Sequence, residues 1–271
     1  MPKKASDLSP DFRFMALFVG PKHAGKTCAA DSFPTPINFL DFDGRIRGLL
    51  GAPWINRERI TYDYFLPKEP NLVEKIDKLL VSQQIMANTP GMFDLQTQVL
   101  DSLTSETYAM LTQGIQTTHR PIGNEQSRGR FLGSVAMAGP EEYGYEAQTT
   151  YDILSALRTI PIPNVICTAH VVEKFGKENP DDKYSPTVVV GEKLSLRDKI
   201  GANIGIYFDH IFRFDRRMVG GFEKFYVKFR GDLACTSYAE LPTGEHDITG
   251  KDFYKFMRSF FKEKTPLTTT N

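Results

Sequence analysis

Glycine, lysine and threonine residues near the amino terminus are spaced for chemistry on an anion. Residues 20–27 read Gly-Pro-Lys-His-Ala-Gly-Lys-Thr, which fits the pattern G-x-x-x-x-G-K-[ST]. Its glycines let the backbone turn tightly, so that successive N–H groups face one phosphate. Lys26 would reach the β- and γ-phosphates of ATP, and the Thr27 hydroxyl would enter a Mg²⁺ shell. The predicted contacts are Gly20, Pro21, Lys22, His23, Ala24, Gly25, Lys26, Thr27 and Cys28.

A carboxylate at the end of a neighbouring strand should complete the Mg²⁺ shell. Asp101 is the first charged residue after the run Thr97 to Leu100, so we assign it to the metal together with Thr27. The alternative is an ordinary aspartate that ends a strand and caps the next helix.

Hydrolysis also needs a group that orients a water molecule toward the γ-phosphate. Asp41 and Asp43 follow the apolar run Ile37 to Leu40, and we take Asp43 as the candidate catalytic carboxylate. Either residue could instead form a turn before Gly44. His170 ends the run Val165 to Ala169 and could sense the γ-phosphate, or it could be a structural histidine bonded to a nearby carbonyl.

These residues need a parallel sheet to bring them together, and the rest of the pattern predicts one. Apolar strand-like runs alternate with helix-like spacing up to about residue 170, which indicates an α/β fold with a mostly parallel central sheet flanked by helices. The later strands are closely spaced and predict a C-terminal antiparallel extension. We expect long irregular loops over residues 112–140 and 171–190. The expected strands are 14–19, 37–40, 60–65, 97–100, 165–169, 206–214 and 222–229, and the expected helices are 26–32, 72–86, 103–111, 141–158 and 252–261.

Composition limits the classes of protein that fit. The 271 residues contain 41% hydrophobic and 24% charged residues, as globular domains do. We expect a short arm over residues 1–12, one domain over 13–264 and a flexible tail over 265–271. Lys+Arg and Asp+Glu both number 33, which argues against a uniformly basic surface but leaves room for a local basic groove. The cysteines number three and no apolar run is long enough for a membrane span, so we expect a cytoplasmic protein without disulfides or membrane contact.

In this order, the motifs resemble the RecA-like P-loop ATPases, and most of all the short phage-encoded members that anneal single-stranded DNA and consist of the core alone. The matching segments are residues 14–27, 39–44, 99–102 and 166–170. The resemblance implies a catalytic carboxylate at Asp43, a polar sensor at His170, and assembly into rings or filaments. It also implies single-stranded DNA as a partner and allows a single-strand-binding protein as another, in the cytoplasm of the host if a phage encodes the chain.

One further match concerns the cations at residues 226–231, Tyr-Val-Lys-Phe-Arg-Gly. This segment looks like the strand end of hexameric helicases, where a lysine and an arginine reach the nucleotide of the neighbouring subunit. By that resemblance Lys228 and Arg230 are candidates for fingers that act in trans. Two cations two residues apart share a strand face, although they could equally form a solvated strand edge.

Three functions remain open at this stage. A protein that anneals or exchanges DNA strands needs cations and stacking surfaces, for which we name Arg120, Arg128, Arg130, Arg216 and Arg217. A P-loop kinase for a nucleotide or small metabolite would use Lys26 and Asp101 in the same way, with residues 112–140 as a lid. The third function is a motor subunit of the helicase-loader type, which acts on a protein partner. One fold can host all three.

Overall fold

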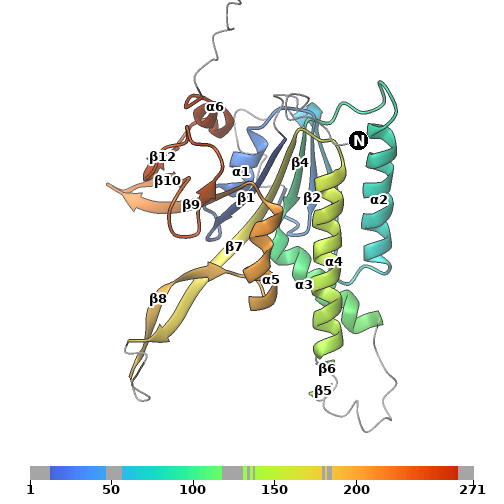
Figure 1. Ribbon diagram of the computed structural model, residues 1–271, viewed down its shortest axis with the longest axis horizontal. Helices are drawn as coiled ribbons and strands as arrows, with labels where there is room; N and C mark the ends of the chain where they lie inside the picture. Colours follow the sequence, from blue (N-terminus) through green and yellow to red (C-terminus); the bar gives the residue numbers. More distant parts are fainter. Residues whose placement is uncertain are drawn as a thin grey trace, which may run out of the picture.

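The computed structural model describes residues 13–46, 57–117, 131–132, 135–136, 138–178, 181 and 185–261. A ten-stranded mixed sheet forms the centre of the molecule (Figure 1). Its main path runs in the order β12-β10-β9-β1-β7-β4-β2-β3, while β11 pairs with β9 and β8 pairs with β7. The strands are β1 (Phe14–Gly20), β2 (Ile37–Asp41), β3 (Ile60–Tyr64), β4 (Thr97–Asp101), β7 (Asn164–Lys177), β8 (Thr187–Leu194), β9 (His210–Val219), β10 (Phe222–Lys228), β11 (Cys235–Thr236) and β12 (Glu245–Asp247).

The six strands from β9 to β3 along this path are parallel to their neighbours, whereas β10 and β12 continue the sheet antiparallel. The predicted parallel sheet with a C-terminal antiparallel extension is therefore confirmed. β7 lies between β1 and β4. Because the carboxyl ends of parallel strands meet at one edge, this order places Gly20, His170 and Asp101 beside one another.

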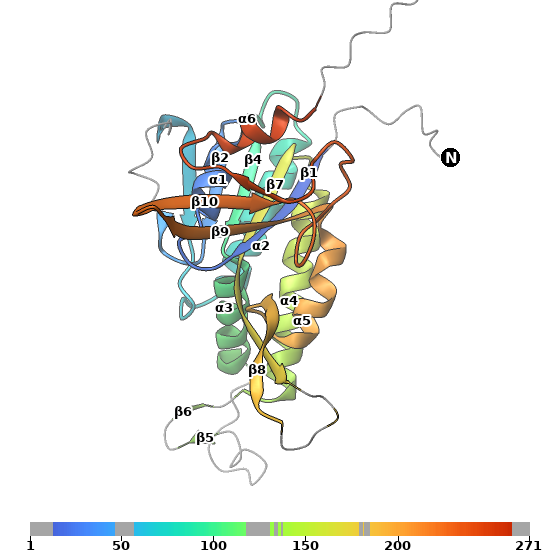
Figure 2. The same ribbon diagram turned by 90° about the vertical axis from the view of Figure 1, so that its left-hand side faces the viewer.

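Helices cover both faces of the sheet, as Figures 1 and 2 show. On one face, α2, α3, α4 and α5 close a core that contains Leu17, Leu100 and Leu154. On the other face, α1 and α6 close an aromatic core that includes Phe18, Phe212 and Phe253. Among the described residues, no helix is both long and apolar enough to cross a lipid bilayer. The helices are α1 (Lys26–Asp31), α2 (Leu72–Ala87), α3 (Leu103–Thr117), α4 (Pro140–Thr159), α5 (Asp198–Asn203) and α6 (Phe253–Arg258), with 3-10 turns η3 (Arg57–Arg59) and η5 (Ile204–Tyr207).

The structure corrects the predicted loop over residues 171–190. β7 continues to Lys177 and pairs antiparallel with β8, so that residues 171–177 and 187–194 form the two strands of a hairpin that projects from the body (Figure 2). The charged residues of this segment hid its strand pattern. Val171 and Val172 pair with Leu194 and Lys193, and Phe175 pairs with Val189, which gives the β-branched and aromatic content of a paired strand.

The predicted loop over residues 112–140 is also shorter than expected. α3 runs to Thr117 and α4 begins at Pro140, whose missing N–H is compatible with the first turn of a helix. Two short strands, β5 (Phe131–Leu132) and β6 (Val135–Ala136), pair with each other in between. The predicted strand over 206–214 begins only at His210, because residues 204–207 form η5. The predicted arm over 1–12 and the tail over 265–271 lie outside the described residues.

Candidate functional site: a phosphate loop at the sheet edge

The phosphate loop, residues 20–27, connects the buried strand β1 to α1. Two of its residues have left-handed backbone conformations, Gly25 with φ 83° and His23 with φ 64°. Gly20 is required for a different reason: a Cβ atom there would collide with the carbonyl oxygen of Phe214 on β9. Gly25 therefore allows the tight turn of the phosphate loop, and Gly20 allows the close approach of the neighbouring strand β9.

Lys26 is held against the loop itself. Its ammonium donates to the carbonyl oxygens of Gly20 at 2.9 Å and Pro21 at 2.8 Å, and it lies 3.4 Å from Nδ1 of His170. These three partners match the three N–H donors of an ammonium group. Burial lowers the pKa of Lys26 to about 8, although the charges of Asp101 and Asp43 oppose this effect. Lys26 is thus a pre-positioned cation at the mouth of the loop.

Asp101 lies directly behind the loop. Its carboxylate accepts hydrogen bonds from the hydroxyl of Thr27 at 2.9 Å and from the hydroxyl of Thr168. Burial raises the pKa of Asp101, while the two hydroxyls oppose that rise and the nearby Asp43 adds to it. A buried carboxylate whose bonded partners are neutral hydroxyls gains from a nearby cation. The pair Thr27 and Asp101 therefore fits a Mg²⁺ ion.

That metal would depend on the nucleotide for further ligands. Among the residues that the structure describes, no group of three or more His, Cys, Asp or Glu side chains could hold a metal ion by itself. Mg²⁺ ordinarily binds through one or two protein groups plus substrate phosphates and water. Thr27 and Asp101 meet that requirement when a phosphate occupies the loop.

Asp43 reaches the same edge from the end of β2. It accepts hydrogen bonds from Ser102 at 3.1 Å and from Ser105, and one of its oxygens lies 3.6 Å from Nε2 of His170. Burial favours a higher pKa for this group, but the bonds from His170, Ser105 and Ser102 prevail and lower the pKa of Asp43 to about 2. Asp43 is therefore ionised at neutral pH and can accept a hydrogen bond from water.

Asp41 has a different role from Asp43. One of its carboxylate oxygens accepts the backbone N–H groups of Asp43, Gly44 and Arg45, at 3.0, 2.8 and 3.4 Å. The other accepts the N–H of Ile46 at 3.3 Å. A carboxylate engaged by four successive N–H groups fixes the turn after β2, and so Asp41 holds the backbone that carries Asp43.

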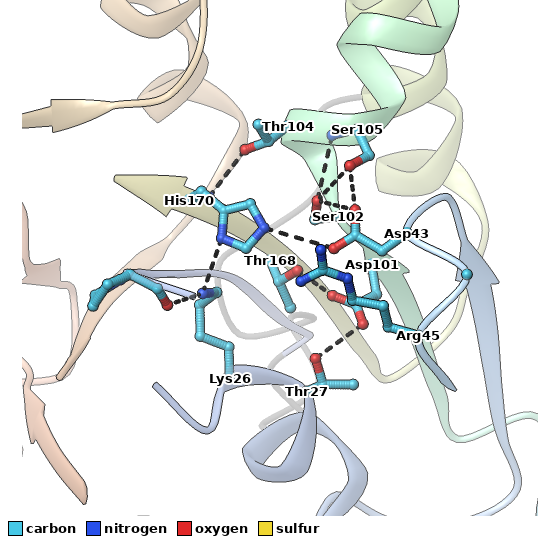
Figure 3. A network of polar contacts seen from close by, with 12 residues as sticks. Lys26, Thr27, Asp43, Arg45, Asp101, Ser102, Thr104, Ser105, Thr168 and His170 are labelled. Carbon is cyan, nitrogen blue, oxygen red and sulfur yellow. Dashed lines mark hydrogen bonds and ion pairs between the residues drawn. The ribbon is translucent and has the colours of Figure 1, made fainter. Parts of the chain in front are cut away.

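His170 lies between Lys26 and Asp43, as Figure 3 shows. Its backbone is fixed on both sides, because its N–H donates to the Thr104 hydroxyl at 2.9 Å and its carbonyl accepts the N–H of Ser195 at 2.8 Å. The imidazole therefore connects the phosphate loop to the carboxylate, and its strand leads directly into the β7–β8 hairpin.

The predicted basic residues lie elsewhere and are mostly paired. Arg230 donates to the carbonyl oxygens of Tyr238 at 2.7 Å and Leu241 at 3.3 Å, while Lys228 lies 3.4 Å from Asp232. The remaining candidates divide into two groups. Arg216 pairs with Glu223, and Arg217 with Asp215 and Glu245, whereas Arg120, Arg128 and Arg130 lie outside the described residues.

Three polar residues of the site were missed as site residues by sequence reasoning: Thr104, Ser105 and Thr168. One of them left a usable signal. Thr168 is two residues before His170, so the two share a strand face and point toward the same edge. Thr104 and Ser105 belong to the first turn of α3, whose approach to His170 and Asp43 depends on packing.

A phosphate loop at the head of a parallel sheet, with carboxylates at the ends of two neighbouring strands, defines the architecture of a P-loop α/β protein. Similar solved structures include the flagellar accessory protein FlaH from Methanocaldococcus jannaschii, at 13% identity and a TM-score of 0.39 over 82% of this chain and 80% of that one. Another is the KaiC-like protein PH0186 from Pyrococcus horikoshii, at 14% identity and a TM-score of 0.42 over 86% and 83%. No family model matches the sequence, and no curated protein matches it.

Proposed function

We propose that this protein is a Mg²⁺-dependent ATPase. The observation that carries the proposal is the convergence of Lys26, the Thr27–Asp101 pair and an ionised Asp43 at one edge of the sheet. The loop and lysine suit a polyphosphate, the hydroxyl and buried carboxylate suit a divalent cation, and a second carboxylate next to them suits a water molecule.

Each residue has a separable role in this reaction. Lys26 and the N–H groups of the loop bind the β- and γ-phosphates and stabilise the charge that develops during transfer. Thr27 and Asp101 would hold Mg²⁺, which would supply charge neutralisation at the phosphate oxygens when bound. Asp43 orients the attacking water, and His170 fixes Asp43 relative to Lys26.

As the macromolecular partner we propose single-stranded DNA, with assembly of several chains into a ring or filament, as in the phage annealing ATPases that the motifs resemble. A single-strand-binding protein is a further candidate partner. Arg216 and Arg217 would have to exchange carboxylates for phosphates to bind DNA. Such an exchange of ion pairs predicts weak binding that falls steeply as the salt concentration rises.

The test measures ATP hydrolysis by the full chain with and without single-stranded DNA, beside its mass by light scattering. We expect hydrolysis that requires Mg²⁺, is accelerated by DNA and comes from a multi-subunit species. Lys26→Ala should bind no ATP, whereas Lys68→Ala, which changes an exposed lysine outside the loop, should bind normally.

Other results would point to the alternatives. Transfer of the γ-phosphate to a nucleotide or metabolite would establish a kinase in place of the DNA function. Hydrolysis that ignores DNA but responds to a helicase would favour a loader. A parent chain that neither binds nor hydrolyses ATP would contradict the whole proposal.

A further inference from the structure

Arg213 is a buried cation beside the phosphate loop that the reaction described above does not use. It lies on β9 in register with Val19, the residue directly before the loop. Its Nη1 would lie 3.2 Å from a Cβ atom added to Gly20, and the same nitrogen donates to the carbonyl oxygen of Phe214. Only 8% of the residue is exposed. The guanidinium is therefore packed against the first residue of the loop.

Lys26 contacts the same glycine through its bond to the Gly20 carbonyl oxygen. After burial itself, the positive charge of Arg213 is one of the causes that lower the pKa of Lys26. Two cations close enough to repel each other lose stability unless negative charge lies near both. In this structure Glu192 supplies negative charge to Arg213, while Asp101 and Asp43 supply it to Lys26. A nucleotide polyphosphate in the loop would supply it to both cations at once.

Arg213 is held in place from the β7–β8 hairpin. Glu192 on β8 accepts two hydrogen bonds from its guanidinium, at 2.8 and 2.7 Å. Glu192 is also directly opposite Glu173 on β7, an arrangement of like charges that is unfavourable without a cation. The β7 strand of the hairpin thus begins beside the site at His170, and the β8 strand carries Glu192, which binds Arg213 beside the loop.

We propose that Arg213 is a second positioning cation for the nucleotide phosphates, and that Glu192 competes with those phosphates for its guanidinium. This inference rests on the proposed function, because it assumes a nucleotide in the loop. A bidentate carboxylate and a phosphate occupy the same fork of N–H donors. Since coupling is reciprocal, bound phosphates weaken the Arg213–Glu192 pair, and loss of Glu192 strengthens phosphate binding. The β7–β8 hairpin is held to β9 while Glu192 binds Arg213, and it loses that contact when phosphates take the guanidinium.

The test measures binding of a fluorescent ATP analogue to the full chain at fixed salt concentration. We expect Arg213→Gln to weaken binding about tenfold and Glu192→Gln to tighten it about fivefold, within the usual range for coupled sites. In the double variant the gain from Glu192→Gln should disappear, because its target guanidinium is absent. The matched control is Lys193→Gln, which alters the adjacent exposed residue on β8, paired with Asp198, and should leave affinity unchanged.

A second readout follows the hairpin. Hydrogen exchange of residues 172–177 and 187–193 should change when the analogue binds to the parent chain, and should not change in Arg213→Gln. Thermal unfolding shows whether each variant folds. Glu192 is partly exposed, so Glu192→Gln decides the question even if Arg213→Gln fails to fold.

The possible failures are distinguishable. If the parent binds the analogue but both single variants weaken binding equally, or neither changes it, Arg213 and Glu192 only brace the fold and the inference is wrong. If the parent does not bind the analogue at all, the proposed function fails, and this inference fails with it.

Discussion

The ammonium nitrogen of Lys26 lies 3.4 Å from Nδ1 of His170. An ammonium group can only donate, so Nδ1 is the acceptor in this contact and the ring nitrogen left for a second partner is Nε2. That nitrogen faces a carboxylate oxygen of Asp43 at 3.6 Å. The imidazole of His170 thus contacts both the lysine that we assign to the phosphates and the carboxylate that we assign to water (Figure 3).

Asp43→Asn should separate binding from chemistry. We expect the ATP turnover number to fall at least about 100-fold, which is the usual size of a general-base contribution, because an amide accepts a proton poorly. ATP affinity should change little, since Lys26 and Thr27 keep their contacts. Steady-state kinetics beside equilibrium binding measure both quantities. The control Asp77→Asn removes an exposed carboxylate on α2 and should be as active as the parent. Unchanged turnover in Asp43→Asn would mean that another group orients the water.

ATP affinity should decrease as the pH rises above about 8. The pKa of Lys26 is lowered to about 8 by burial, so in the free protein this group loses its proton above that pH. Bound phosphates favour the protonated form and raise the pKa of Lys26 in the complex. The dissociation constant should therefore rise by up to about tenfold per pH unit there. Titrations between pH 6.5 and 9.5 measure it. Lys26→Arg keeps its charge throughout this range, and a parent curve as flat as that of this variant would refute the prediction.

Glu106 on α3 should make the folded state less stable as the pH increases. It is fully buried, and burial raises its pKa to about 8 although Thr150 donates to it. In the unfolded chain this carboxyl titrates near pH 4.3. Between these two values the folded state binds the extra proton, so the free energy of unfolding falls as pH rises from about 5 toward 8. Each pKa unit is worth about 1.4 kcal/mol, which makes the total several kcal/mol.

Denaturant unfolding of Glu106→Gln tests this assignment. The variant should lose much of the decrease with pH and be more stable than the parent at pH 9. Glu74→Gln, which alters an exposed residue on α2, should keep the parent's pH dependence. Parallel curves for the parent and Glu106→Gln would show that Glu106 is not the group that titrates.

Arg230→Ala distinguishes an internal brace from a finger that acts on a neighbouring subunit. The variant loses two hydrogen bonds to the carbonyl oxygens of Tyr238 and Leu241, so its free energy of unfolding should fall by about 1–3 kcal/mol. If Arg230 also acts in trans, ATP turnover should fall at a temperature where the variant is fully folded, while ATP affinity stays nearly intact. Arg59→Ala, an exposed arginine in η3, should change neither quantity. Full activity with reduced stability would leave only the structural role.

The sequence by itself was sufficient for the place of the phosphate loop between a strand and a helix, for the parallel sheet, and for the position of Asp101 at the end of a strand. Each of these depends on local information: a glycine-lysine spacing, a run of apolar residues, or the first charge after a strand. The structure places Thr27 and Asp101 in contact, as that local pattern predicts. The β7–β8 hairpin escaped prediction because charged residues interrupt its apolar residues without regular alternation and nothing within the segment shows that the two strands pair.

Only the tertiary structure decided which side chains meet. The order of strands placed β7 between β1 and β4, and therefore His170 between Lys26 and Asp43. It also separated Asp41, which holds a turn, from Asp43, which faces the site, although the two are alike in sequence. Arg213 and Glu192 are 21 residues apart, and their contact depends on a long-range pairing of strands. Strand order and register are set by packing over the whole sheet, and no local pattern of residues encodes them.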